Sequence, residues 1–265
     1  MLRGKFPGQV PKPDACWGAD LGGCAGPITR EHLVSANLLT TSVRAEVRVP
    51  VAQGWRVEES VQLTLNDLRD NILCEAHNRA LGTSADAAAK RLYRALVHSH
   101  HPTRLRGSRV PRAPKDRNIS GTHFGAWLCK THCNIVVARG GRPDENFVRY
   151  AFGRPTPVPL RFYCVGALGA KARFAYPGDP VVSWYPLTPD QPASFSFDAF
   201  KIALGGLETI VAVLPPGNEI RLNDEPMIDR VAQLEWPTPL GAYRVRFDWG
   251  DDPGVVPLTS PPSRG

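Results

Sequence analysis

Two stretches of the sequence decide the fold: CWGADLGGC at residues 16–24 and CEAHN at residues 74–78. Zinc in proteins prefers four tetrahedral nitrogen or sulfur ligands, commonly arranged as two close pairs from separate segments. The second stretch offers a Cys-x-x-His pair, whose spacing lets one short turn present both ligands to a single ion. The cysteines of the first stretch stand further apart, but the glycine-rich segment between them can form an enlarged knuckle. The sequence therefore predicts one zinc site formed by Cys16, Cys24, Cys74 and His77.

An alternative interpretation is that these four are unrelated small residues of a core, because intracellular cysteines are often just buried thiols. Six cysteines in a reducing compartment are typical of metal ligands or buried thiols rather than disulfides. The zinc interpretation is favoured because a structural ion would stabilise a small module that buries little apolar surface of its own.

The composition and net charge of the chain limit the classes of binding partner. The chain has 265 residues, and 42% of them are hydrophobic, which is ordinary for a globular protein with a core. A net charge of +7 favours a polyanionic partner, nucleic acid before an anionic membrane. The first residues contain no apolar segment of the secretory kind, and the longest apolar stretch, residues 202–214, is interrupted by Glu208 and too short to span a bilayer. We expect a cytoplasmic protein without a membrane partner.

The amino-acid pattern changes near residue 142, from helical to strand-like. Residues 85–97 carry apolar side chains on one helical face, and a second helix is expected over residues 123–139, before two glycines. Residues 98–118 are basic and contain three prolines, which is typical of a loop. Short β-branched and aromatic segments then alternate with Pro/Gly turns. We predict an α+β protein with a lead-in (1–15), a helical zinc module (16–142), a β-rich domain (143–252) and a tail (253–265).

The zinc stretches are parts of a longer pattern. The first continues as CWGADLGGCAGPITREHLVSANLL over residues 16–39, and the second lies within DNILCEAHNRALGTSADAAAKRLYRAL over residues 70–96. Glu31-His32 stands between the ligand pairs, and Asn78 follows the last ligand directly. In these features residues 16–97 resemble the zinc-bound type of HNH, or ββα-metal, endonucleases. The resemblance implies a module of two strands and a helix with a second, hard metal ion, as found in proteins of bacterial defence and of mobile elements such as phages.

The resemblance also implies a role for each residue of the pattern. His32 would be the general base that activates water, a task that suits a neutral imidazole near pH 7. Glu31 and Asn78 would be oxygen ligands of Mg²⁺ or Mn²⁺, and Asn71 would orient His32. The expected activity is metal-dependent hydrolysis of phosphodiester bonds in DNA rather than RNA, with zinc as a structural ion.

Basic residues accompany this module. Residues 91–117 are rich in Lys and Arg and contain a single acidic residue, Asp116. Such a stretch suits sequence-independent contact with a nucleic-acid backbone, and a solvated linker is the alternative. The residues expected to contact phosphates are Arg30, Arg91, Arg94, Arg104 and Arg106. The β-rich part would select the substrate or bind a protein partner.

The sequence departs from the family pattern in two ways: it lacks a third histidine of the pattern, and the loop between His32 and Cys74 is long. His32 could be a surface histidine after a charged turn, Asn78 a capping residue, and Asp86 a cap of the helix over residues 85–97. The second function hypothesis is therefore a non-catalytic zinc-stabilised module, on a degenerate HNH scaffold, that binds nucleic acid or protein. Cys129 and Cys133 are expected to be buried helix thiols rather than ligands.

Overall fold

The fold is taken from a computed structural model. The structure describes residues 15–35, 46–53, 56–64, 69–100, 117–138, 140–165, 181–184, 199–204, 207–213, 221–222, 225–226, 228–238 and 241–250. The predicted tail and, apart from residue 15, the predicted lead-in lie outside these ranges, as do Arg104 and Arg106.

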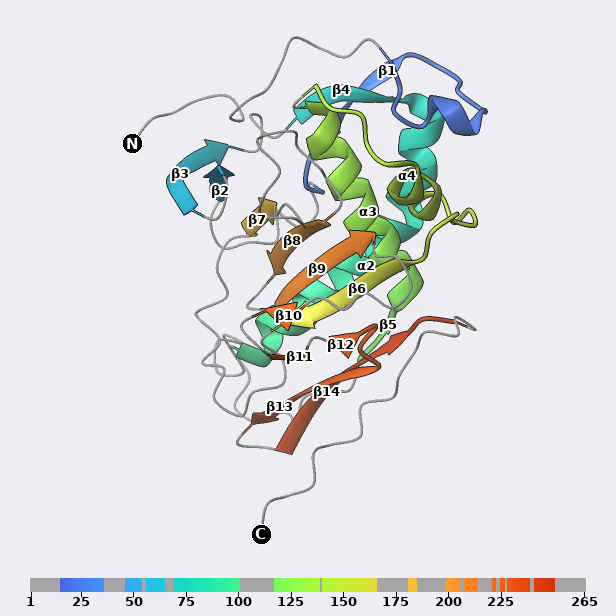
Figure 1. Ribbon diagram of the computed structural model, residues 1–265. Helices are drawn as coiled ribbons and strands as arrows, with labels where there is room; N and C mark the ends of the chain where they lie inside the picture. The colour runs from blue at the N-terminus through green and yellow to red at the C-terminus, as the bar shows by residue number, and fades with distance from the viewer. Residues whose placement is uncertain are drawn as a thin grey trace, which may run out of the picture.

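The N-terminal part contains two strands that lead into a helix (Figure 1). After a short 3-10 turn, η1, strand β1 pairs antiparallel with β4, and a separate hairpin of β2 and β3 is inserted between them. Helix α2 follows β4 without an intervening loop. The bounds are η1 Ala19–Leu21, β1 Ile28–His32, β2 Glu46–Gln53, β3 Arg56–Thr64, β4 Arg69–Cys74 and α2 Glu75–His100.

Helix α2 begins ten residues earlier than the predicted helix over residues 85–97, directly after the Cys-x-x-His cysteine. Its buried side chains recur every three or four residues, which is the period of one helical face. Many of them are alanines, so the neighbouring helix α3 can approach closely. Asp86 lies in the interior of α2, so the alternative in which it caps a helix beginning at residue 85 is wrong.

Helix α3 (Gly121–Ala138) is buried along almost its whole length and confirms the second predicted helix. It lies between α2 and the short helix α4 (Glu145–Ala151). Two glycines allow close packing on the C-terminal part. A Cβ atom on Gly121 would overlap the ring of Trp249, and one on Gly125 would lie 3.0 Å from the ring of Phe162.

The C-terminal part is rich in strands, as the sequence predicts. One sheet has the order β12-β6-β9-β8-β7, and its neighbouring strands are antiparallel. A second sheet joins β13 and β14 to β5, which comes from the N-terminal half and runs parallel to β14. The bounds are β5 Arg117–Ser120, β6 Leu160–Val165, β7 Val181–Trp184, β8 Ala199–Leu204, β9 Leu207–Val213, β10 Arg221–Leu222, β11 Glu225–Pro226, β12 Ile228–Asp229, β13 Gln233–Thr238 and β14 Gly241–Asp248.

One hydrophobic cluster runs through the described residues from Cys16 to Trp249. It contains side chains of α2, α3 and α4 together with residues of β6, β9 and β14. The predicted boundary at residue 142 therefore does not separate two cores, although the composition changes there. None of the helices in the described ranges has the length and apolar character needed to cross a membrane.

Candidate metal centre

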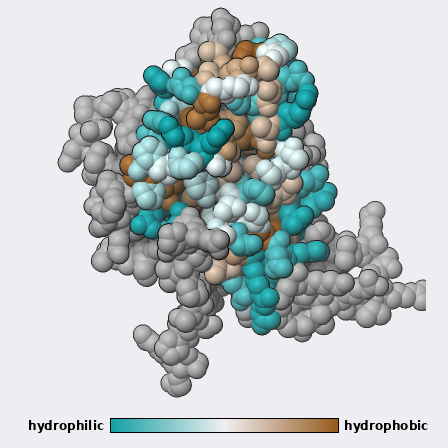
Figure 2. All heavy atoms as spheres, turned by 90° about the vertical axis from the view of Figure 1, so that its right-hand side faces the viewer, coloured by the Kyte–Doolittle hydropathy of each residue, from teal (hydrophilic) through white to brown (hydrophobic). Residues whose placement is uncertain are grey.

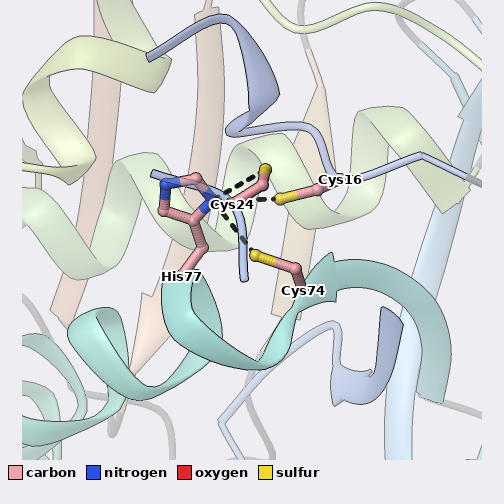
Figure 3. A group of neighbouring side chains, drawn as sticks. All are labelled: Cys16, Cys24, Cys74 and His77. Carbon is pink, nitrogen blue, oxygen red and sulfur yellow. Dashed lines mark hydrogen bonds between the residues drawn. The ribbon is translucent and has the colours of Figure 1, made fainter. Parts of the chain in front are cut away.

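The four predicted zinc ligands come together from three elements (Figure 3). Cys16 and Cys24 flank the η1 turn, Cys74 is the last residue of β4, and His77 lies in the first turn of α2. The ligand atoms of the four residues lie within 4.8 Å of one another. The structure thus assembles the cluster that the sequence predicts.

The geometry of the cluster fits zinc better than a set of hydrogen bonds. The Sγ atoms of Cys16, Cys24 and Cys74 lie 3.2, 3.5 and 3.4 Å from Nδ1 of His77. A single nitrogen lone pair accepts one thiol hydrogen well, so it does not explain three thiols aimed at the same atom. Tetrahedral zinc, with bonds of about 2.3 Å to sulfur and about 2.0 Å to nitrogen, separates these ligands by about 3.5 Å. The donor set and the spacing therefore suit a structural Zn²⁺ ion.

Glycines with positive φ make the wide spacing of Cys16 and Cys24 workable, because Gly22 and Gly23, which lie between them, have φ angles of 72° and 75°. Gly26 has a φ of 74°, and a Cβ atom on it would lie 2.9 Å from the side chain of Glu75. The loop can therefore fold back tightly against the start of α2. There the carbonyl oxygens of Ala25 and Pro27 accept hydrogen bonds from the backbone N–H groups of Ala76 and Glu75, at 3.1 and 3.0 Å. These bonds satisfy helix N–H groups that have no partner within the helix.

The pKa values of Cys16 and Cys74 are shifted in opposite directions. Burial raises the pKa of Cys16 to about 12. Burial also acts to raise the pKa of Cys74, but hydrogen bonds from the backbone N–H groups of His77 and Ala25 outweigh it and lower the pKa overall. Zinc binds thiolates, so loading of the site releases protons, above all from Cys16.

Aromatic side chains cover one side of the cluster. The ring of Phe152, which follows α4, lies 4.9 Å from the ring of His77 and 5.4 Å from that of Trp17. Cys24, in contrast to Cys16 and Cys74, is exposed. A cleft of about 760 Å³ lies beside this loop, between η1, the end of α3 and α4. Its lining includes Cys16 and Trp17 but none of the predicted catalytic residues, so we assign it no chemistry.

Glu31 lies inside the protein, in a polar network that sequence reasoning missed. Its Oε1 atom is 2.9 Å from Nζ of Lys130, which lies in the middle of α3. The same Nζ lies 3.2 and 3.1 Å from the two carboxylate oxygens of Asp86 on α2. Ser35 donates a hydrogen bond to Asp86 and accepts one from Nε1 of Trp127 at 2.8 Å. Strand β1 and helices α2 and α3 thus meet at one buried ammonium group.

Asn78 reaches strand β1 from the first turns of α2. Its side-chain amide donates a hydrogen bond to Oγ1 of Thr29 at 3.0 Å. Burial raises the pKa of Glu31, and the charge of Lys130 and its hydrogen bond to this carboxylate partly offset the effect. Asn78 thus connects the start of α2 to β1 at Thr29, two residues before Glu31.

His32 lies next to this group in sequence but makes different contacts. Neighbouring residues of a strand point to opposite faces, and Glu31 is buried whereas His32 is half-buried. Nε2 of the His32 ring accepts a hydrogen bond from Nε of Arg69 at 2.6 Å. Burial, followed by the charges of Arg69 and Lys130, lowers the pKa of His32 to about 4. The imidazole is therefore neutral at pH 7.

Two further residues define the surroundings of His32. Nδ2 of the buried Asn134 donates to the backbone oxygen of His32 at 3.1 Å, and its Oδ1 accepts from Nε1 of Trp17 at 2.9 Å. Asn71, which was expected to orient His32, pairs with Arg30 across the β1–β4 ladder. The side chain that contacts the His32 ring is Arg69, its direct partner in that ladder.

The basic residues predicted to contact phosphates are partly described. Arg30 on β1 is exposed, and so are Arg91 and Arg94 on α2. Figure 2 shows that hydrophilic residues cover much of the side of the molecule on the right in Figure 1, around a narrower apolar band. The predicted contacts at positions 104 and 106 lie outside the described residues.

Comparison with known proteins gives no relative: no protein-family profile, no curated protein and no solved structure matches this chain. The function therefore has to be argued from the geometry of the site.

Proposed function

We propose that this protein is a metal-dependent, HNH-like endonuclease that hydrolyses phosphodiester bonds in DNA and is held together by a structural zinc ion. The observation that carries the proposal is the hydrogen bond from Asn78 on α2 to Thr29 on β1 at 3.0 Å, next to the cluster of candidate zinc ligands. It joins the start of the helix that carries His77 to the strand that carries Glu31 and His32.

The oxygen atoms of Glu31 and Asn78 are the kind of ligand that a hard cation prefers. Mg²⁺ and Mn²⁺ prefer oxygen ligands, and Mg²⁺ is commonly held by one or two carboxylates while it keeps several waters. Glu31 and Asn78 would supply the protein ligands. The metal ion that they hold would neutralise charge on the scissile phosphate and on the leaving oxygen.

His32 is the candidate general base. The ring is neutral at physiological pH, as a general base must be, but its lowered pKa makes it a weak base while Arg69 is in place. Departure of the Arg69 charge would raise the pKa toward the ordinary range that suits proton transfer from water. Nε2 already accepts a hydrogen bond from Arg69, so the proton of the neutral ring is on Nδ1 and Nε2 is the basic nitrogen. In the proposed reaction the guanidinium of Arg69 moves from Nε2 to a phosphate oxygen, and a water molecule takes its place beside the ring.

Substrate binding would rest on backbone contacts. The net charge of +7 and the exposed Arg30, Arg91 and Arg94 favour a polyanion. Contacts of this kind are independent of base sequence and weaken steeply with salt. DNA is preferred over RNA by the family resemblance alone.

A second candidate is a zinc-stabilised module that binds nucleic acid without cleaving it. The observation that favours it is that the proposed metal ligand and the proposed general base are each already paired with a cationic side chain. Lys130 contacts Glu31, and Arg69 contacts His32. If these pairs persist when DNA binds, neither a metal ion nor a water molecule gains access.

A cleavage assay separates the two candidates. Supercoiled plasmid is incubated with the parent, with His32→Ala and with His123→Ala, in the presence of Mg²⁺ or Mn²⁺ and at constant zinc content. His123 is an exposed histidine at the start of α3 and provides the matched control. We expect nicking by the parent and the control only. Equal nicking by His32→Ala, or retention of plasmid in a gel shift without nicking under either metal, would contradict the nuclease proposal.

A further inference from the structure

Lys130 is the most deeply buried charge of the described network. Its side chain is 1% exposed, on a helix that packs against other elements along nearly its whole length. The ammonium group has three N–H donors, and three carboxylate oxygens lie within 3.2 Å of it. An isolated buried ammonium would be strongly unfavourable, so the site around it is built to hold a cation.

The charges at this point do not cancel. Glu31 and Asp86 carry two negative charges when ionised, and Lys130 carries one positive charge, so the group as a whole remains negative. Ser35 donates a further hydrogen bond to the carboxylate of Asp86. A divalent ion would therefore be attracted to Glu31, but it would approach a carboxylate whose Oε1 atom is already held by an ammonium group 2.9 Å away.

We propose that Lys130 is the resident cation of this site and that a divalent metal ion binds to Glu31 only in competition with it. The inference rests on the proposed hard-metal site at Glu31 and Asn78 and adds a determinant from α3, outside the HNH-like segment. Lys130 keeps the two carboxylates ionised and paired when no metal is bound, and it weakens metal binding. Removal of its charge then converts a weak divalent site into a tight one.

Lys130→Met is the sharpest perturbation, because methionine retains most of the lysine stem and lacks only the terminal charged group. Electron paramagnetic resonance of Mn²⁺ measures binding directly, and Mn²⁺ prefers oxygen ligands, so it leaves the thiolate zinc cluster alone. We expect Lys130→Met to bind Mn²⁺ at least about tenfold more tightly than the parent. The thermal stability of the variant should then depend strongly on Mn²⁺, whereas that of the parent should not.

Three further variants keep the result interpretable. Lys90→Met makes the same change on α2 and should leave Mn²⁺ affinity unchanged. Glu31→Gln combined with Lys130→Met should abolish the gain, because it removes the carboxylate that the ion needs. Two unpaired carboxylates could prevent Lys130→Met from folding, so the comparison is repeated with Asp86→Asn as the background. Adding Lys130→Met to Asp86→Asn leaves one carboxylate and should again tighten Mn²⁺ binding.

The outcomes distinguish this inference from the proposed function. Unchanged Mn²⁺ affinity on removal of the lysine charge in both backgrounds overturns it, even if the parent nicks plasmid. A gain in affinity that requires Glu31 supports it, even if neither protein cleaves DNA. Retention of the gain in the variant that also carries Glu31→Gln would place the ion elsewhere and would overturn it as well.

Discussion

Replacement of Cys74 with Ala is expected to release residues 15–27 from the protein while the α2–α3 core stays folded. This segment contains only one short 3-10 turn, η1, and its buried apolar side chains are Cys16 and Trp17. Its order therefore depends on the metal cluster more than on packing. Cys74 is the ligand that joins the loop to β4, so its loss removes the attachment.

The magnitudes support local release. Ordering the thirteen residues of the segment costs roughly 13–26 kcal/mol of backbone entropy. Burial of the Trp17 side chain returns roughly 4–6 kcal/mol, and structural zinc in small fingers contributes about 10–16 kcal/mol. With zinc the two sides balance, and without it the segment is short of stability by most of the zinc contribution. The core around Leu92 and Trp127 does not depend on this term.

Hydrogen–deuterium exchange of the peptide covering residues 15–27, together with zinc analysis after dialysis against a chelator, measures the effect. Cys74→Ala should lose zinc and exchange fast in this peptide while α3 stays protected. Cys129→Ala provides the matched control, because it removes a buried thiol of α3 outside the cluster. Slow exchange and full zinc content in Cys74→Ala would refute both the assignment of the ligands and the account of the loop.

Three other predictions use residues around the site. Folding lowers the pKa of His32 from 6.5 to about 4, so between these pH values the unfolded chain binds a proton that the folded protein does not. The neutral His32 ring therefore contributes fully to stability above pH 6.5, and this contribution is lost as the pH falls to 4. Urea unfolding of His32→Gln should show a shallower loss of stability over that window than the parent. Gly121→Ala should destabilise by about 1–3 kcal/mol or more in chemical denaturation, because the new methyl group would overlap the ring of Trp249; an unchanged midpoint would contradict this packing. Asn134→Ala should cost about 1–3 kcal/mol, because it removes the partners of Trp17 Nε1 and of the His32 carbonyl, and a red shift of tryptophan emission should accompany the loss.

The zinc site could be predicted from the sequence because its signal is local. The Cys-x-x-His pair lies where a strand ends and a helix begins, and the glycines between Cys16 and Cys24 explain the wider spacing of the first pair. The α+β class could be predicted because helix-like sequence patterns give way to strand-like patterns along the chain. The pairing of β5 with β14 could not be predicted, because the two strands lie far apart in the sequence and no local pattern encodes their register.

The polar network could not be predicted for a different reason. Residues 121–138 are mostly apolar, and a lysine on such a helix is normally expected to extend to solvent. Lys130 can stay buried only because Glu31 and Asp86 arrive from two other elements, and that convergence is a tertiary property. Arg69 was missed in the same way, since its role depends on its register opposite His32 in the ladder.

One face of α3 connects these parts. Trp127, Lys130 and Asn134 are spaced three and four residues apart, so they lie on one side of the helix. Trp127 reaches Ser35, Lys130 reaches Glu31 and Asp86, and Asn134 reaches the His32 carbonyl, so this side positions the end of β1 and the residues just beyond it. The HNH-like pattern ends before α3. Two chains with the same pattern could therefore differ in metal dependence according to the side chain that α3 presents to Glu31, and in this chain that side chain is a cation.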